Sequence, residues 1–130
     1  MDKLSLLNKQ LTTALEQNNG VLAGSLVDEI IISCEEFNVE NYDIFPIDEL
    51  IKKEYFEQAL KLLGLCENED HPFSTTYDIY IKEAFCYLKL KDFANAHGRL
   101  VIPLEEGGVK EAIELEKQIT LEEQIELSSR

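Results

Sequence analysis

Several features that define other protein classes are scarce in this chain of 130 residues. Only three prolines and six glycines are present, so little in the sequence interrupts helices. The cysteines, Cys34, Cys66 and Cys86, are odd in number and widely spaced, which favours buried reduced thiols over disulfides. No apolar run approaches the roughly 20 residues that span a bilayer. Because Met1-Asp2-Lys3 begins a polar, periodic segment, we expect no signal peptide and a cytoplasmic protein.

Basic residues are also few. The chain has 12 Lys and Arg against 26 Asp and Glu, for a formal net charge of −14. This charge repels phosphate backbones and anionic lipids, so we expect neither a nucleic acid nor a membrane as partner. Residues 1–73 carry 5 basic and 15 acidic side chains (net −10), residues 74–110 carry 5 of each, and residues 111–130 carry 2 and 6 (net −4). The near-neutral stretch, 74–110, is least opposed to close association with a partner.

What is present in quantity is apolar residues at helical spacing. The composition, 45% hydrophobic and 29% charged, is that of a folded globular protein, and the length suits a single domain over 1–130. No stretch alternates with period two over a useful length, so we expect no sheet. Helices are predicted over about 4–15, 22–37, 47–53, 55–66, 74–90, 93–104 and 109–127. The conformation of residues 38–54 stays open, because Pro46 favours a loop while its apolar neighbours favour packing.

Three turn-and-helix segments align with one another: Asn19-Gly20-Val21-Leu22-Ala23, Tyr55-Phe56-Glu57-Gln58-Ala59 and Asp92-Phe93-Ala94-Asn95-Ala96. Their alanines are separated by 36 residues (23 to 59) and by 37 residues (59 to 96). A large apolar residue follows each alanine four positions later, as Val27, Leu63 and Leu100. The pattern resembles the tetratricopeptide repeat (TPR) family, whose helix pairs of about 34 residues pack through small residues.

The unit from Tyr80 to about Pro103 carries this resemblance best. Its Ala84, Tyr87, Phe93, Ala96 and Leu100 stand where the family has a small residue, two aromatics, alanine and a large apolar residue. The resemblance implies an all-α fold of antiparallel helical hairpins in a TPR-like right-handed stack of six to seven helices. Residues 109–127 would then form a C-terminal capping helix. Three residues depart from the pattern, namely Pro46, Glu83 and Pro103, and another helical bundle stays open as the alternative.

The sequence offers few groups for catalysis or metal binding. His71 lies in the acidic segment 67–72, whose spacing differs from that of an EF-hand loop, so a solvated loop is expected there. His97 lies on a helix next to Gly98. There is no C-x-x-C motif, no His pair at zinc-ligand spacing, no base local to Cys34 or Cys66 and no phosphate loop. We therefore expect no enzyme activity, no metal and no cofactor.

Aromatic residues gather in one part of the chain: Tyr77, Tyr80, Phe85, Tyr87 and Phe93. Most of this cluster is expected in the core. Five aromatics within 17 residues cannot easily all face one narrow helix seam. We therefore assign Tyr77, Tyr80 and Tyr87, together with Leu63, to a groove that binds a partner segment through apolar bodies and hydroxyl groups.

These features favour a protein-binding module that acts as a small chaperone or adaptor and holds a helical or extended partner segment in a helical groove. Residues 84–97 are similar to repeats of type III secretion chaperones, which implies chaperoning and assigns no residue a role. The alternative is an acidic inhibitor or immunity-type protein that blocks a basic site on its target. A third hypothesis is a homodimer, which an exposed apolar C-terminal helix would support.

Overall fold

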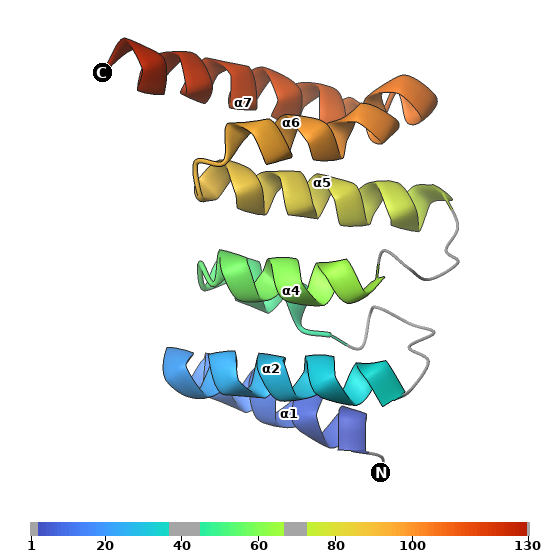
Figure 1. Ribbon diagram of the computed structural model, residues 1–130, viewed down its shortest axis with the longest axis vertical. Coiled ribbons are helices and arrows are strands. Elements are labelled where there is room, and N and C mark those ends of the chain that lie inside the picture. Colours follow the sequence, from blue (N-terminus) through green and yellow to red (C-terminus); the bar gives the residue numbers. More distant parts are fainter. Residues whose placement is uncertain (1–2, 37–44, 67–72, 130) are drawn as a thin grey trace. The chain divides into compact units, whose positions relative to one another are not determined.

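The computed structural model describes residues 3–36, 45–66 and 73–129. Every regular element in these ranges is helical, which confirms the predicted all-α class without a sheet. The ranges contain seven α-helices and one π-helical turn, in agreement with the six to seven helices predicted (Figure 1). None of these helices is both long and apolar enough to cross a membrane. By its contacts the chain divides into two compact units, 1–70 and 71–130, and the single domain expected from its length stays a prediction.

The first unit consists of two helical hairpins. Helices α1 (Lys3–Glu16) and α2 (Gly20–Glu36) run antiparallel, and the short helix α3 (Ile47–Lys52) is followed by α4 (Phe56–Cys66) (Figure 1). The apolar stripes predicted from the periodicity are buried, since α1 packs on α2 and α2 on α4. The buried residues of these helices include Leu7, Leu11, Leu15, Leu26, Ile30, Ile47, Leu50 and Leu62. Pro46 directly precedes α3, in agreement with a short first helix in the second hairpin.

The second unit is a hairpin covered by a third helix. Helix α5 (Phe73–Lys89) packs on α6 (Phe93–Ile102), and the long helix α7 (Lys110–Ser128) packs on both. Helix α5 begins at Phe73, one residue before the predicted start. The core of this unit joins all three helices and consists of Ala84, Leu88, Ala96, Leu100, Ala112, Leu115 and Ile119.

A π-helical turn, η2 (Pro103–Gly107), connects α6 to α7. The sequence predicted that α6 would continue to about Leu104, but α6 ends at Ile102 and the chain widens into this turn. Gly108 then adopts a left-handed backbone conformation (φ 53°), which glycine accepts without steric cost. Gly107 is required for a different reason, because a Cβ at this position would lie 2.8 Å from Cε2 of Tyr77.

The turns of the three hairpins are built alike. Each contains a non-glycine residue with a left-handed backbone, namely Asn18, Glu54 and Lys91. In each turn the N–H of the next residue donates to a carbonyl five positions back: Asn19 to Ala14 (2.9 Å), Tyr55 to Leu50 (2.8 Å) and Asp92 to Tyr87 (2.9 Å). This bond defines a Schellman motif, which satisfies the last carbonyls of the first helix and reverses the chain. The local structure therefore repeats three times at the spacing of the aligned alanines.

Small residues lie where the helices of each hairpin meet. Ala23, Ala59 and Ala96, which the sequence alignment superimposes, are all buried, as are Val27, Leu63 and Leu100. An alanine at such a position lets the neighbouring helix approach closely, and the larger residue one turn later fills the adjoining groove. The aligned positions thus share burial as well as sequence. Predictions for residues 38–44 and for the acidic loop at 67–72, including His71, fall outside the described residues.

Candidate partner-binding surfaces

A groove with a volume of about 350 Å3 lies between α1 and α2. Its position follows from the Schellman turn, which sets the two helices side by side, and from Ala14, whose short side chain leaves space between them. The floor consists of Ala14, Leu22 and Leu26. Leu22 keeps 43% of its surface exposed and is therefore accessible from solvent.

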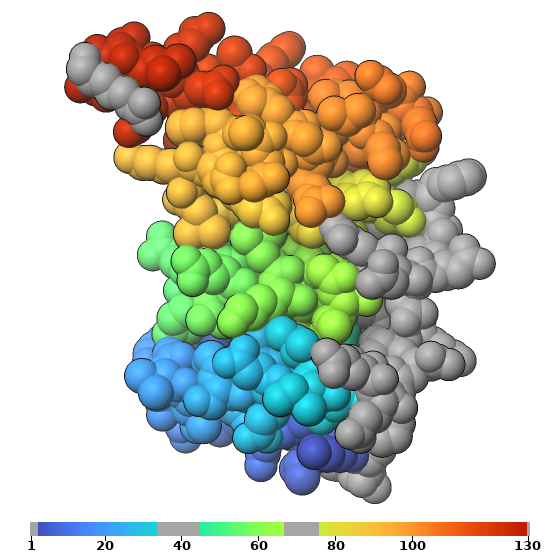
Figure 2. Space-filling model, in the orientation of Figure 1, coloured from blue at the N-terminus to red at the C-terminus, as the bar shows by residue number. Residues whose placement is uncertain are grey.

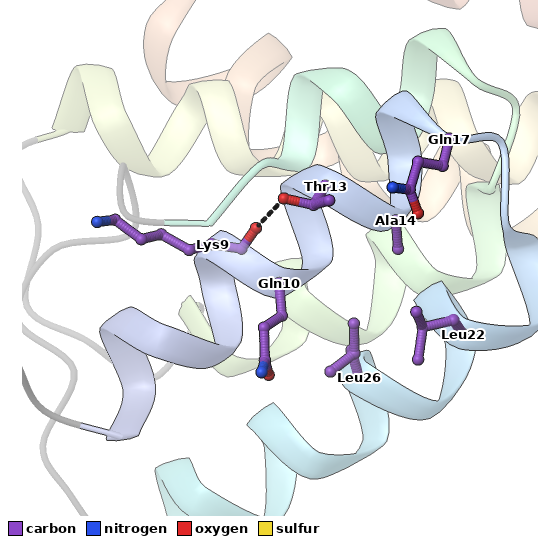
Figure 3. A pocket seen from close by; sticks show the side chains of 7 residues that line it. All are labelled: Lys9, Gln10, Thr13, Ala14, Gln17, Leu22 and Leu26. Carbon is purple, nitrogen blue, oxygen red and sulfur yellow. Dashed lines mark hydrogen bonds between the residues drawn. The ribbon is translucent and has the colours of Figure 1, made fainter.

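Polar side chains form the rim of the α1–α2 groove. Gln10 extends from α1 toward α2 beside Leu26, whereas the amine of Lys9 extends away from the floor (Figure 3). The hydroxyl of Thr13 donates to the carbonyl of Lys9 (3.1 Å) and so is already partnered. The amides of Gln10 and Gln17 can donate to or accept from a polypeptide backbone. An apolar floor with amides along its rim suits a peptide segment with exposed apolar side chains.

The three predicted tyrosines all lie half-buried on α5. Tyr77 packs its ring against Gly107 and thus closes the second unit at η2. Tyr87 packs against the core of that unit, and the guanidinium of Arg99 lies over its ring, 6.0 Å from the centroid. Tyr80 lies two helical turns from Tyr87 on the same flank of α5. Tyr77 and Tyr87 therefore use part of their surface for packing, and the rest of each side chain is accessible to solvent.

Leu63 differs from the tyrosines. It lies in α4, in the first unit, and has no exposed surface. Its side chain offers a partner nothing to contact in this structure, so we leave it out of the proposed binding surface. Leu63 shares this burial with Val27 and Leu100, which the sequence alignment places at the same position.

Two ionisable residues of α5, Glu83 and Cys86, are buried beside the tyrosines. The Glu83 side chain is almost fully buried, and its Oε2 lies 4.0 Å from Nε of Arg99, which neutralises part of its charge. Burial raises the pKa of the Cys86 thiol to about 12, and the negative charge of Glu83 adds to this effect. The thiol therefore stays protonated at neutral pH and is not a nucleophile. Cys66 is likewise buried and reduced, whereas the side chain of Cys34 falls outside the described residues.

His97 makes the contact that sequence analysis missed. Its Nδ1 lies 2.6 Å from Oε1 of Glu116 and its Nε2 lies 3.2 Å from Oε1 of Glu123, both on α7. Both partners are acceptors, so only the protonated ring, with two N–H groups, donates to both. Partial burial of the ring lowers the pKa of His97, but the bonds to Glu123 and Glu116 and their charges outweigh this and raise it above its usual value. We call this contact the His97 bridge.

The outer surface of α7 is more apolar than its glutamates suggested. Leu121, Ile125 and Leu127 keep 58%, 59% and 60% of their surfaces exposed. In Figures 1 and 2 the C-terminal turns of α7 extend beyond the turn that joins α5 to α6. A cavity of about 230 Å3 lies beside them, between α7 and that turn. The capping helix expected from the sequence therefore covers the hairpin with one face and exposes leucine and isoleucine elsewhere.

Among the described residues, no group of three or more His, Cys, Asp or Glu side chains has the arrangement of a metal site. Comparison with protein families, with curated proteins and with solved structures gives no match for the chain.

Proposed function

We propose that the chain is a non-enzymatic protein-binding module that acts as a small chaperone or adaptor. In this proposal its TPR-like hairpins hold a helical or extended segment of another protein. The α1–α2 groove is the observation that carries the proposal, because Leu22 on its apolar floor is exposed to solvent. The three alike turns support the TPR-like interpretation, since they give each hairpin the same local geometry. Tyr77, Tyr80 and Tyr87 remain candidates for a second contact on α5.

The chemistry of the groove indicates which segment it would hold. Leucine and alanine on the floor favour an apolar side chain, whose burial would be the main source of affinity. The amides of Gln10 and Gln17 favour backbone groups or polar side chains at the rim of the groove. Among the described residues that line it, Lys9 alone is charged, so contacts in the groove should depend weakly on salt.

The test compares two neighbouring substitutions. Leu22→Glu places a carboxylate on the groove floor, whereas Val21→Glu places it one residue earlier on a side chain that is 87% exposed and does not line the groove. Both positions lie in the first turn of α2, where an acidic residue interacts favourably with the helix dipole, so both variants should keep the fold. The tagged chain would first capture its partner from the native lysate at low and at high salt.

The captured partner would then be purified and its dissociation constant measured with each variant. We expect Leu22→Glu to weaken binding about tenfold or more and Val21→Glu to change it by less than about twofold. Binding should persist at high salt. Equal affinities for both variants would remove the groove from the proposal.

An acidic inhibitor or immunity-type protein is the second candidate. The observation that favours it is the net charge of −10 over residues 1–73, which would steer the chain toward a basic target. The same capture experiment separates the two functions. An inhibitor would release its target at high salt and would tolerate Leu22→Glu, and the target would lose activity when the complex forms.

A further inference from the structure

The exposed apolar surface of α7 lies at its C-terminal half. Leu121 and Ile125 are four residues apart, so they share one face of the helix, whereas Leu127, two residues after Ile125, lies on a different side of α7. The opposite face of α7 is already used, since Ala112, Leu115 and Ile119 are buried in the core of the second unit. The exposed residues are therefore additional to the contacts that hold α7 in place.

The cavity beside this face has an apolar floor and charged walls. Leu88, Phe93 and Ile125 supply the apolar surface. The charged residues that line it are of both signs, Lys89 and Lys91 opposite Glu122 and Glu126. Lys91 Nζ lies 3.2 Å from Oε2 of Glu126 across the cavity, and Lys89 Nζ lies 5.4 Å from the centroid of the Phe85 ring. The local charge is thus balanced, although the whole chain carries −14.

We propose that this face, Leu121 and Ile125 with the adjoining cavity, docks a second copy of the same chain about a two-fold axis. A two-fold contact sets the same patch of both copies against each other, so the patch must be complementary to itself. This patch meets that requirement, because it combines a protruding leucine with an apolar cavity that can accept one. Leu121 of each copy would enter the cavity of the other and shield its floor from water.

The charges on the rim favour a second copy over an unrelated partner. Lys91 and Glu126 already pair within one copy, which leaves Lys89 and Glu122 as charges of opposite sign on the rim. A partner whose surface carries charges of a single sign would attract one of these two residues and repel the other, whereas a second copy presents both signs, so Lys89 of each copy can meet Glu122 of the other. The large net charge opposes association at long range, and added salt screens it. The dimer should therefore become more stable as salt increases, unlike a complex formed by attraction between opposite net charges.

The test is the molar mass of the full chain in solution, measured by sedimentation equilibrium at low and at high salt. A monomer has a mass of 14.9 kDa, and a dimer has twice that mass. We expect a dimer whose dissociation constant decreases with salt. Leu121→Gln combined with Ile125→Gln should raise the dissociation constant about tenfold or more, because both side chains lose apolar contact area. Circular dichroism should report unchanged helicity, since both positions are exposed.

Val21→Gln combined with Ile32→Gln is the matched control, since it removes two exposed apolar residues from the first unit. These substitutions should leave the dissociation constant unchanged. A wild-type chain that stays monomeric at every concentration and salt would overturn the proposal, as would a dimer that only the control variant disrupts. Neither result depends on the α1–α2 groove, which is tested by Leu22→Glu and its partner.

Discussion

At the scale of the residue, His97 has the clearest consequence for stability. Its pKa is raised in the folded protein, so the bridge contributes stability that is complete below the unfolded value, about 6.5, and is lost as pH rises through the folded value. His97→Gln removes this contribution. We expect the variant to be less stable by about 1 kcal/mol near pH 5.5, with a smaller difference near pH 8.5. Urea unfolding followed by circular dichroism at both pH values measures the two differences.

Lys117→Gln is the control for the His97 bridge. Lys117 is exposed on α7 and takes no part in the His97 bridge, so its replacement removes a positive charge without removing either contact of the ring. Its effect on stability should therefore be the same at both pH values. If the difference between His97→Gln and the wild type did not decrease toward high pH, the ring would not be held in its charged form by Glu116 and Glu123.

Contacts between distant residues, such as the His97 bridge, could not be predicted from the sequence. Local sequence does not pair His97 with Glu116 and Glu123, which lie 19 and 26 positions away on a different helix. One signal was available, because carboxylates at 116 and 123 are seven residues apart and so share a face of α7. The buried Leu63 shows a second limit of prediction from the sequence. Its spacing placed it at an apolar position of the aligned segments, but spacing alone does not distinguish a core residue from a groove residue.

At the scale of the element, the helices were the most predictable feature because hydrophobic periodicity depends only on local sequence. The short helix α3 and its successor α4 follow the predicted bounds closely, with Pro46 just before α3 as the sequence suggested. The π-helical turn at Pro103–Gly107 was not predicted. It depends on how the ring of Tyr77 packs against Gly107, which is a contact between distant segments rather than a local preference.

The repeated turns lead to a prediction about Glu54. Its φ of 67° is left-handed, a conformation that is unfavourable for residues with a Cβ and open to glycine. Glu54→Gly should therefore stabilise the protein by about 0.5 to 1 kcal/mol, even after the greater freedom of glycine in the unfolded chain is counted. The free energy of unfolding in urea measures the change.

Glu57→Gly is the matched control for this turn. Glu57 lies only three residues later and is also exposed, but it belongs to the first turn of α4. Glycine there should destabilise the protein by about 1 kcal/mol, because it loses helix propensity and a favourable charge near the helix N-terminus. If Glu54→Gly raises the free energy of unfolding and Glu57→Gly lowers it, the difference is due to the left-handed backbone at residue 54. A loss of stability in Glu54→Gly would show that this turn does not hold the left-handed residue.

At the scale of the whole molecule, the net charge of −14 sets the balance between attraction and repulsion. Attractive pairs are present in the described residues, among them Lys61 with Asp28 and Lys82 with Asp78, but they are partly exposed and so contribute little each. The excess carboxylates repel one another more strongly in the compact state than in the unfolded chain. Salt should therefore stabilise the fold, whatever partner it binds.

We expect the midpoint of thermal unfolding to rise by a few degrees, about 3–8 °C, between about 0.02 and 0.3 M sodium chloride, because the Debye length falls below 10 Å in this range. Low protein concentration keeps self-association from contributing. Glu29→Gln combined with Glu114→Gln removes one exposed carboxylate from each unit, so it should raise the midpoint at low salt and have less effect at high salt. A midpoint that falls with salt would mean that pairs such as Lys61 with Asp28 outweigh the repulsion. In that case the charges of the folded chain would be placed so that their net electrostatic interaction stabilises the fold.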